Sequence, residues 1–250
     1  MKPPIIAGNW KMNKGVKEAE DLTSGILEMV KGIDDREVVL CPPFTALYRV
    51  SELLKAKTIK LGAQDLFYEE NGAWTGEISA SMLTDLGCKY VIIGHSERRQ
   101  ILKEDDIIIN KKIKQALKYS LSPIFCVGET EKERKEGREK EIVERQIRLG
   151  LKEIDLTFRI PFVIAYEPVW AIGTGNTCKE EEAEKMHIFI RGLISKLYTN
   201  DLAEEMRILY GGSVKPDNID AIMKMPNIDG CLVGGASLNI ESFCRIVEFS

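Results

Sequence analysis

Long apolar runs are missing from this sequence of 250 residues, and so are linkers and low-complexity segments. A membrane-spanning helix needs about 20 consecutive apolar residues, and the apolar stretch within residues 1–10 is too short for a secretory signal peptide. We therefore expect a cytoplasmic protein that makes no contact with a membrane. The length is typical of one α/β barrel, so we expect a single domain over residues 1–250.

The sequence also has no basic cluster interleaved with aromatic residues. Its 35 Lys and Arg residues are outnumbered by 39 Asp and Glu residues, and the formal net charge is −4. This charge argues against nucleic acid as a partner, because binding to the phosphate backbone relies on basic groups. Any anion site must then be local, built from backbone N–H groups or a single Lys.

Zinc-finger and Cys-x-x-Cys spacings are absent among the six cysteines. Cys41, Cys126 and Cys231 lie in apolar runs, so we expect buried free thiols. The sequence shows no cluster of metal-ligating residues either, and we expect no metal site.

Eight short apolar runs are present, and a helical pattern follows each of them. The runs are residues 5–7, 38–41, 59–62, 90–93, 123–127, 162–166, 207–210 and 231–233. Three of the helical segments show a clear apolar stripe, formed by Ala19, Leu22, Ile26, Met29 and Ile33, by Val143, Ile147, Leu151 and Ile154, and by Ala183, Met186, Ile190 and Leu197. Strand–helix units without an antiparallel cluster indicate a parallel sheet, and eight of them favour closure into a (β/α)8 barrel of the α/β class.

Residues 129–141 are almost all charged, with both signs at helical spacing. We expect a solvated helix face there and assign it no chemistry.

Polar residues and glycines follow the apolar runs, where a parallel barrel would gather them at one mouth. They are Asn9, Lys11, Gln64, His95, Ser96, Glu97, Glu129, Glu167, Gly211, Gly212, Ser213, Gly234 and Gly235. Glu167 directly follows the sixth run and precedes Pro168 and a loop over residues 169–177 that holds Trp170 and two glycines. That loop suits a lid over a polar ligand, although an ordinary strand-to-helix connection with a surface Glu would look similar.

Each of these residues has a structural alternative. Lys11 could be a solvated surface lysine. His95 could be a structurally bonded imidazole, but we favour it as functional over His187, which lies within a helical stripe and is expected to pack there. The glycine pairs could be tight turns, yet glycines after the seventh and eighth runs are what a phosphate cradle of backbone N–H groups requires.

Together, one carboxylate, one imidazole, one ammonium group and one phosphate cradle indicate proton transfer next to a carbonyl group of a small phosphorylated molecule. A base would take a carbon-bound proton, and hydrogen-bond donors would hold the enediolate oxygen. A lid would exclude water and so protect an intermediate that can lose its phosphate group.

Five segments closely resemble the triosephosphate isomerase family, and the resemblance runs from end to end. They are residues 7–12 (AGNWKM), 94–99 (GHSERR), 165–175 (AYEPVWAIGTG), 210–214 (YGGSV) and 232–237 (LVGGAS). The resemblance implies a single (β/α)8 TIM barrel that interconverts dihydroxyacetone phosphate and D-glyceraldehyde 3-phosphate without a cofactor or metal. The implied mechanism is one already known for this family.

Carried over to this sequence, the resemblance assigns a role to each matching residue. It implies that Glu167 moves the proton between two substrate carbons, that neutral His95 acts at the carbonyl oxygens, and that Lys11 and Asn9 support the negative charge. Glu97 would position the lysine. The phosphate would be held by backbone amides at Gly173, Ser213, Gly234 and Gly235.

The loop from Asp65 to Glu77 matches a family segment that docks into a second subunit. The loop carries Phe67, Tyr68 and Trp74, which are unlikely residues to leave in water, although they could fold back on their own barrel. We expect a homodimer, with a tetramer as the alternative.

Two alternatives to this enzyme remain. An aldolase would use Lys11 to form a Schiff base that borohydride could trap. A catalytically silent phosphate-binding barrel would act as a binding or scaffold protein, but such proteins have usually lost the base or the imidazole, and this sequence keeps both.

Overall fold

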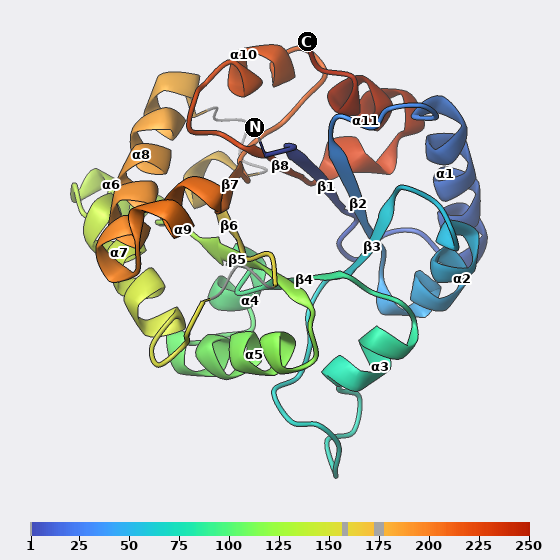
Figure 1. Ribbon diagram of the computed structural model, residues 1–250, viewed down its shortest axis with the longest axis horizontal. Coiled ribbons are helices and arrows are strands. Elements are labelled where there is room, and N and C mark those ends of the chain that lie inside the picture. The colour runs from blue at the N-terminus through green and yellow to red at the C-terminus, as the bar shows by residue number, and fades with distance from the viewer. Residues whose placement is uncertain (1, 157–159, 173–177) are drawn as a thin grey trace.

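The computed structural model describes residues 2–156, 160–172 and 178–250, and within them eight parallel strands close into a barrel (Figure 1). Each strand pairs with its neighbour in chain order, and β1 pairs with β8 to close the sheet. The strands are β1 Ile5–Asn9, β2 Glu37–Cys41, β3 Lys60–Ala63, β4 Tyr90–Ile93, β5 Ser122–Val127, β6 Val163–Tyr166, β7 Arg207–Tyr210 and β8 Gly230–Val233. The predicted (β/α)8 barrel is confirmed.

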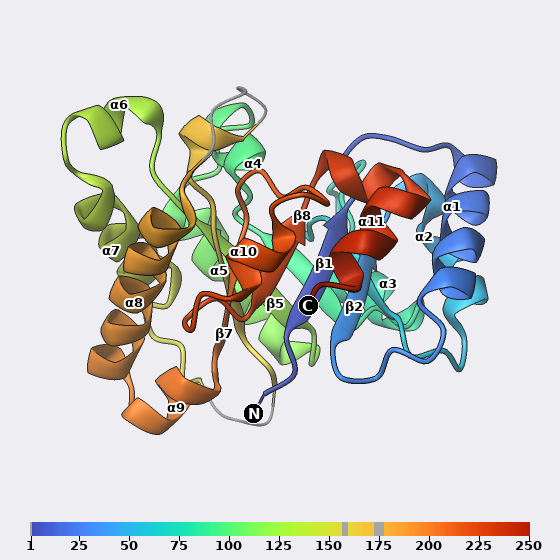
Figure 2. The same ribbon diagram turned by 90° about the horizontal axis from the view of Figure 1, so that it is seen from above.

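Helices surround this barrel, with α7 and α8 on one side and α1 and α2 on the other (Figure 2). The α-helices are α1 Val16–Met29, α2 Phe44–Leu54, α3 Ala80–Asp85, α4 Ser96–Gln100, α5 Asp106–Lys118, α6 Glu131–Lys135, α7 Glu139–Gly150, α8 Glu180–Leu197, α9 Asn200–Glu205, α10 Ile219–Met223 and α11 Ile240–Val247. Two 3-10 helices, η1 Val169–Ala171 and η2 Gly235–Leu238, follow β6 and β8 directly. In the part of the chain that the structure describes, no helix is both long and apolar enough to cross a membrane.

Between their ends the strands are apolar because both of their faces are covered, although β2, β3 and β7 begin with the charged residues Glu37, Lys60 and Arg207. In β1, Ile5 and Ala7 belong to the core inside the barrel, whereas Ile6 belongs to the core between the barrel and its helices. Successive side chains of a strand point to opposite faces, so a closed sheet with an outer ring of helices buries both faces beyond the first residues of the strands. This explains why the runs look continuous rather than alternating in the sequence.

The predicted stripe from Ala183 to Leu197 lies within α8, whereas the other two predicted stripes run past the ends of their helices. Met29 is about half exposed, and Ile33 and Ile154 lie beyond the ends of α1 and α7. Both still pack against the core from the loops that follow. Apolar spacing alone does not mark where a helix ends, because a residue after the helix can continue to cover the same core.

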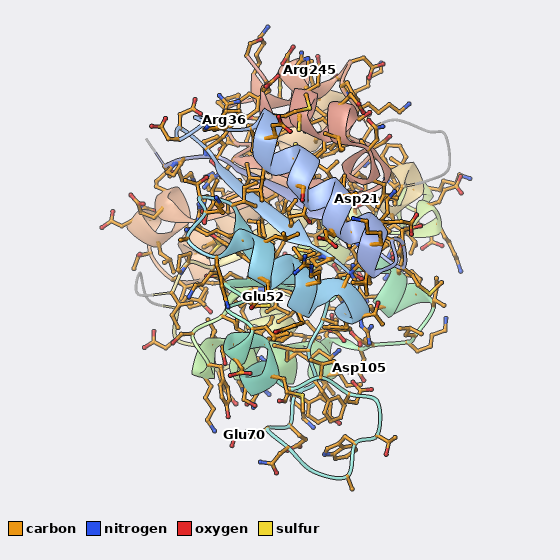
Figure 3. The ribbon with its side chains drawn as sticks, turned by 90° about the vertical axis from the view of Figure 1, so that its right-hand side faces the viewer. Asp21, Arg36, Glu52, Glu70, Asp105 and Arg245 are labelled. Atoms are coloured by element: carbon orange, nitrogen blue, oxygen red, sulfur yellow. The ribbon has the colours of Figure 1, made fainter. Side chains whose placement is uncertain are left out.

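The loop from Asp65 to Glu77 projects away from the barrel between β3 and α3 (Figure 1), and Figure 3 shows Glu70 on its outer part. Its aromatic residues gather around Phe67, whose ring lies 4.3 Å from that of Tyr68 and 4.9 Å from that of Trp74. This aromatic cluster gives the loop a defined shape without a strand or helix of its own.

A buried cluster of charges holds the root of this loop. The ammonium group of Lys112 lies 2.7 Å from the Asp65 carboxylate and 2.6 Å from that of Glu104. Arg98, in α4, contacts the same two carboxylates at 3.0 and 2.7 Å. Two cations and two anions therefore join the loop to α4 and α5, and each buried charge has a partner of opposite sign.

Stability should depend on the ionisation of Asp65. Burial raises the pKa of this carboxyl from 3.8 to about 6, although Lys112 and Arg98 oppose the rise. A carboxyl group whose pKa is raised by folding stabilises the folded state while it is protonated. This contribution is complete below pH 3.8 and is lost as the pH rises through 6. Relative to an Asp65→Asn variant, which does not titrate there, the wild-type free energy of unfolding should fall by about 2 kcal/mol between pH 4 and pH 7. Denaturant titrations of both proteins at each pH measure this difference. A constant difference would mean that Lys112 and Arg98 cancel the effect of burial, and a wild type that gains stability as the pH rises would mean that they outweigh it.

Candidate active site

Most of the predicted site residues surround one cavity of about 300 Å³ at the carboxyl ends of the strands. It is lined by Asn9, Lys11, His95, Glu167, Ile172, Gly211, Gly212, Ser213, Val214, Lys215, Leu232, Gly234, Gly235 and Ala236. Glu97 is not part of the lining but contacts Lys11, and Gly173 lies outside the described residues. A cavity of this size fits a small molecule rather than a macromolecular segment.

Glu167 follows β6 and is almost fully buried, at 2% exposed. One carboxylate oxygen, Oε2, accepts a hydrogen bond of 2.8 Å from the backbone N–H of Ser96. The other, Oε1, lies 3.0 Å from Nε2 of His95. Both contacts come from the segment after β4, so two strands that are far apart in sequence together hold this carboxylate.

His95 is the N-cap residue of α4, and this position determines where its proton lies. Nδ1 accepts a hydrogen bond of 3.2 Å from the backbone N–H of Glu97. A nitrogen that accepts a hydrogen bond carries no proton, so in the neutral imidazole the proton is on Nε2. Nε2 faces the Glu167 carboxylate and can donate to it.

The two groups shift each other's pKa. Burial raises the pKa of Glu167, but His95, the Ser96 N–H and Lys11 together lower it below the ordinary value of 4.5. Burial lowers the pKa of His95, but the carboxylates of Glu167 and Glu97 together raise it above the ordinary value of 6.5. Glu167 is therefore ionised at neutral pH. A ligand that displaces this carboxylate from the imidazole removes the main influence that favours protonated His95.

Lys11 is held in a strained backbone conformation, with φ at +53°. The Asn9 side chain accepts a hydrogen bond of 3.0 Å from its N–H, and the Gln64 side chain donates one of 2.8 Å to its carbonyl oxygen. Its ammonium group lies 2.5 Å from Glu97. Non-glycine residues with positive φ are uncommon and cluster at functional sites, where the surrounding structure holds them in place.

Two glycines press against Glu167 from opposite sides. A Cβ atom on Gly128 would overlap the carbonyl oxygen of Glu167, and one on Gly211 would lie 2.9 Å from its Cγ. Gly211 was predicted only as part of a phosphate cradle, and Gly128 was not predicted at all. Only glycine fits at positions 128 and 211, because a β-carbon at either position would displace Glu167 and the end of β6.

Ser213, Gly234 and Gly235 line the same cavity. A side chain on Gly235 would meet nothing within 4 Å, and one on Gly234 would lie 3.5 Å from Cε of Lys11. The backbone here is therefore accessible to a ligand, next to the lysine. Exposed backbone at the start of η2 fits an anionic group.

The expectation that residues 129–141 form only a solvated helix face is wrong for Glu129. This carboxylate is completely buried and accepts hydrogen bonds from the Tyr166 hydroxyl at 3.1 Å and the Trp170 indole N–H at 2.8 Å. The guanidinium group of Arg134 lies 4.5 Å from the centre of the Trp170 ring. Glu129 and Arg134 thus hold Trp170 in η1, whereas most other residues of the stretch are exposed.

The remaining His and Cys residues have structural roles. His187 is fully buried in α8, its Nδ1 lies 3.2 Å from the carbonyl oxygen of Asn227, and burial lowers its pKa to about 3. All six cysteines are buried free thiols, as predicted. No group of three or more His, Cys, Asp or Glu side chains is placed to hold a metal ion among the residues that the structure describes.

The geometry suits proton transfer on a small anionic ligand. An ionised, buried carboxylate can take a proton, an imidazole N–H next to it can donate to an oxygen, and a lysine can stabilise negative charge. The accessible backbone at Gly235 lines the same cavity.

Comparison with known proteins identifies the family. A profile described as triosephosphate isomerase matches residues 4–250. The triosephosphate isomerase of Roseiflexus sp. (strain RS-1) is 52% identical over 249 residues, which cover 100% of this chain and 98% of the relative. That of Dictyoglomus thermophilum is 51% identical over 248 residues, covering 99% and 100%. The crystal structure of triosephosphate isomerase from Bartonella henselae matches with a TM-score of 0.90 at 36% identity, covering 99% of this chain and 98% of that one. The chain therefore belongs to the triosephosphate isomerase family.

Proposed function

We propose that Glu167 is the base with which this enzyme interconverts dihydroxyacetone phosphate and D-glyceraldehyde 3-phosphate. The observation that carries the proposal is the pairing of a buried, ionised carboxylate with the His95 N–H in a cavity that also holds Lys11. Glu167 would remove a proton from one substrate carbon and return it to the neighbouring carbon. The intermediate between these steps is an enediolate.

His95 would donate from Nε2 to the carbonyl oxygens. The Glu97 N–H at Nδ1 opposes a second proton on the ring, so the neutral imidazole acts once substrate has displaced Glu167 from it. Lys11 and Asn9 would stabilise the charge on the enediolate, and Glu97 would position Lys11 through their 2.5 Å contact.

The substrate phosphate would lie against the backbone at Gly173, Ser213, Gly234 and Gly235. Support comes from the accessible backbone at Gly235 and from the position of Gly234 next to Lys11. Backbone N–H groups suit a phosphate because they present donors without a counter-ion. No cofactor enters this mechanism.

An assay of both reaction directions in D₂O tests the proposal. Proton transfer through a base that exchanges with solvent predicts isomerisation together with deuterium at the carbon that receives the proton. A covalent adduct trapped by borohydride on Lys11 would instead support an aldolase. A folded protein without turnover would support a scaffold.

We also propose that the chain forms a homodimer through the loop from Asp65 to Glu77. The loop projects away from the barrel (Figure 3), and Trp74 on it is 48% exposed. The large apolar side chains that are more than half exposed in the first half of the sequence are Met12, Tyr48, Met82, Ile101, Leu102 and Ile107. Apolar surface of this kind usually marks a protein–protein contact.

Replacing Trp74 with Asp should therefore yield a species of half the wild-type mass, because a buried charge weakens an apolar interface. Sedimentation velocity at several concentrations measures the mass. Ile188→Asp is the matched control, since Ile188 is 52% exposed but lies on α8, away from the loop. A wild-type monomer, or equal masses for both variants, would argue against this interface.

A cytoplasmic location and a single catalytic domain complete the proposal. The six buried free thiols are usual for proteins kept in a reducing compartment, and the barrel closes between the first strand and the last. Fractionation with compartment markers and limited proteolysis test the two points.

A further inference from the structure

Lys215 lines the glycine-rich end of the cavity and has no role in the mechanism above. It contributes to the lining together with Ser213, Gly234 and Gly235, and its side chain is exposed to solvent. Within residues 2–156, 160–172 and 178–250, no carboxylate forms an ion pair with its ammonium group, and this includes Asp217 two positions further on. Most exposed lysines face open solvent, whereas this one borders a cavity.

The backbone around Lys215 is fixed by a single side chain. Asn218 accepts a hydrogen bond of 2.8 Å from the Lys215 N–H through Oδ1, and its Nδ2 donates one of 2.9 Å to the carbonyl oxygen of Ser213. Val214 between them is buried. The turn after β7 is therefore held in place, and the backbone of Lys215 has a fixed position beside the cavity.

Without Lys215, the cavity has too little positive charge to balance an anionic substrate. Lys11 is already paired with Glu97 at 2.5 Å, and Glu167 adds an ionised carboxylate to the lining. Without Lys215 the lining holds one cation and one anion. A triose phosphate brings up to two negative charges at neutral pH, in a protein whose own net charge is −4. Attraction of such a substrate needs a further local positive charge.

We propose that Lys215 is a further substrate-binding residue, whose ammonium group pairs with the substrate phosphate at the rim of the cavity. This inference rests on the proposed phosphate site at Ser213, Gly234 and Gly235. The phosphate keeps its charge throughout the reaction, so the ion pair stabilises the bound substrate and the transition state equally. An interaction of this type lowers KM and leaves kcat unchanged.

The test compares Lys215→Gln with wild type in isomerisation kinetics and in inhibition by inorganic phosphate. We expect KM and the inhibition constant for phosphate to rise about threefold to fivefold at low ionic strength, as for a solvent-exposed ion pair. The difference should shrink at high salt because the charges are screened. Lys215→Arg should restore the wild-type values, and turnover of unphosphorylated D-glyceraldehyde should not change.

Lys224→Gln is the control, because it removes the same charge from an exposed lysine near Lys2 and Pro4, which precede β1 at the other end of the barrel. Equal KM values for the two variants, or a loss confined to kcat, would overturn the inference while an active wild type leaves the proposed function intact. If wild type lacks isomerase activity, calorimetric titration with inorganic phosphate tests the anion site on its own. Phosphate binding that is weakened by Lys215→Gln but not by Lys224→Gln would support the anion site without the isomerase reaction. No phosphate binding would overturn both the anion site and the proposed function.

Discussion

Replacing Glu167 with Gln is expected to lower kcat by about 10²- to 10⁴-fold, the range that a positioned general base contributes. Glutamine has nearly the same shape as the glutamate and can still accept the Ser96 N–H, but it cannot take a proton from carbon. KM should change little, because the side chain is not expected to hold the phosphate. Steady-state kinetics in both directions measure the effect.

The pH dependence gives a second readout of the same residue. The base works only when it is ionised, and the pKa of Glu167 in the free enzyme lies below 4.5. Activity that depends on this group is therefore present at neutral pH and is lost as the pH falls through its lowered pKa. The acid limb of kcat/KM, which reports the free enzyme, should lie below pH 4.5.

Glu205→Gln is a suitable control for the Glu167 variant, since Glu205 is an exposed residue of α9 beside Lys2. The circular dichroism spectrum and the melting temperature of both variants should be close to those of wild type. If the Glu167 variant keeps more than a tenth of the wild-type kcat while folded, another group must move the proton.

Replacing Lys11 with Met should lower kcat/KM by about 10²- to 10³-fold, the effect of removing one preorganised group that stabilises developing charge. Methionine keeps the length and the apolar stem of the side chain but lacks the ammonium group. The change leaves Glu97 without its 2.5 Å partner. Because Glu97 is partly exposed, water can solvate its carboxylate, so the fold should tolerate the substitution.

Kinetics with both substrates measure the loss, and Lys17→Met is the control because Lys17 is an exposed residue of α1 in the same part of the chain. An unchanged kcat/KM would mean that Lys11 is a solvated surface lysine after all. Activity that disappears together with a borohydride-trapped adduct would instead indicate an aldolase.

The sequence predicted the barrel because its signals are local and repeat eight times. A short apolar run followed by a helical stripe is visible without knowledge of any contact, and the polar residues that follow each run need only the rule that parallel strands end at one mouth. Asn9, Lys11, His95, Glu167 and Ser213 were identified in this way, and the structure places them around one cavity.

The same local reasoning failed for Glu129. Glu129 follows the fifth apolar run and was listed at the mouth, but the charged stretch that it begins indicates a solvated residue. In the structure, Tyr166 and Trp170 enclose it from the neighbouring strand and loop. A long-range contact of this kind leaves no local signal, since burial depends on what the rest of the chain brings to that point.

The order of the strand–helix units, the chemical types of the groups at the strand ends and the family resemblance of their motifs can all be read along the chain. The distances that make these groups act together cannot: the 3.0 Å between His95 and Glu167, the hydrogen bond that leaves the His95 proton on Nε2, and the close fit of Gly128 against Glu167 appear only in the folded protein. Residue type and periodicity act along the chain, whereas these distances depend on how β4, β5 and β6 pair in the closed sheet.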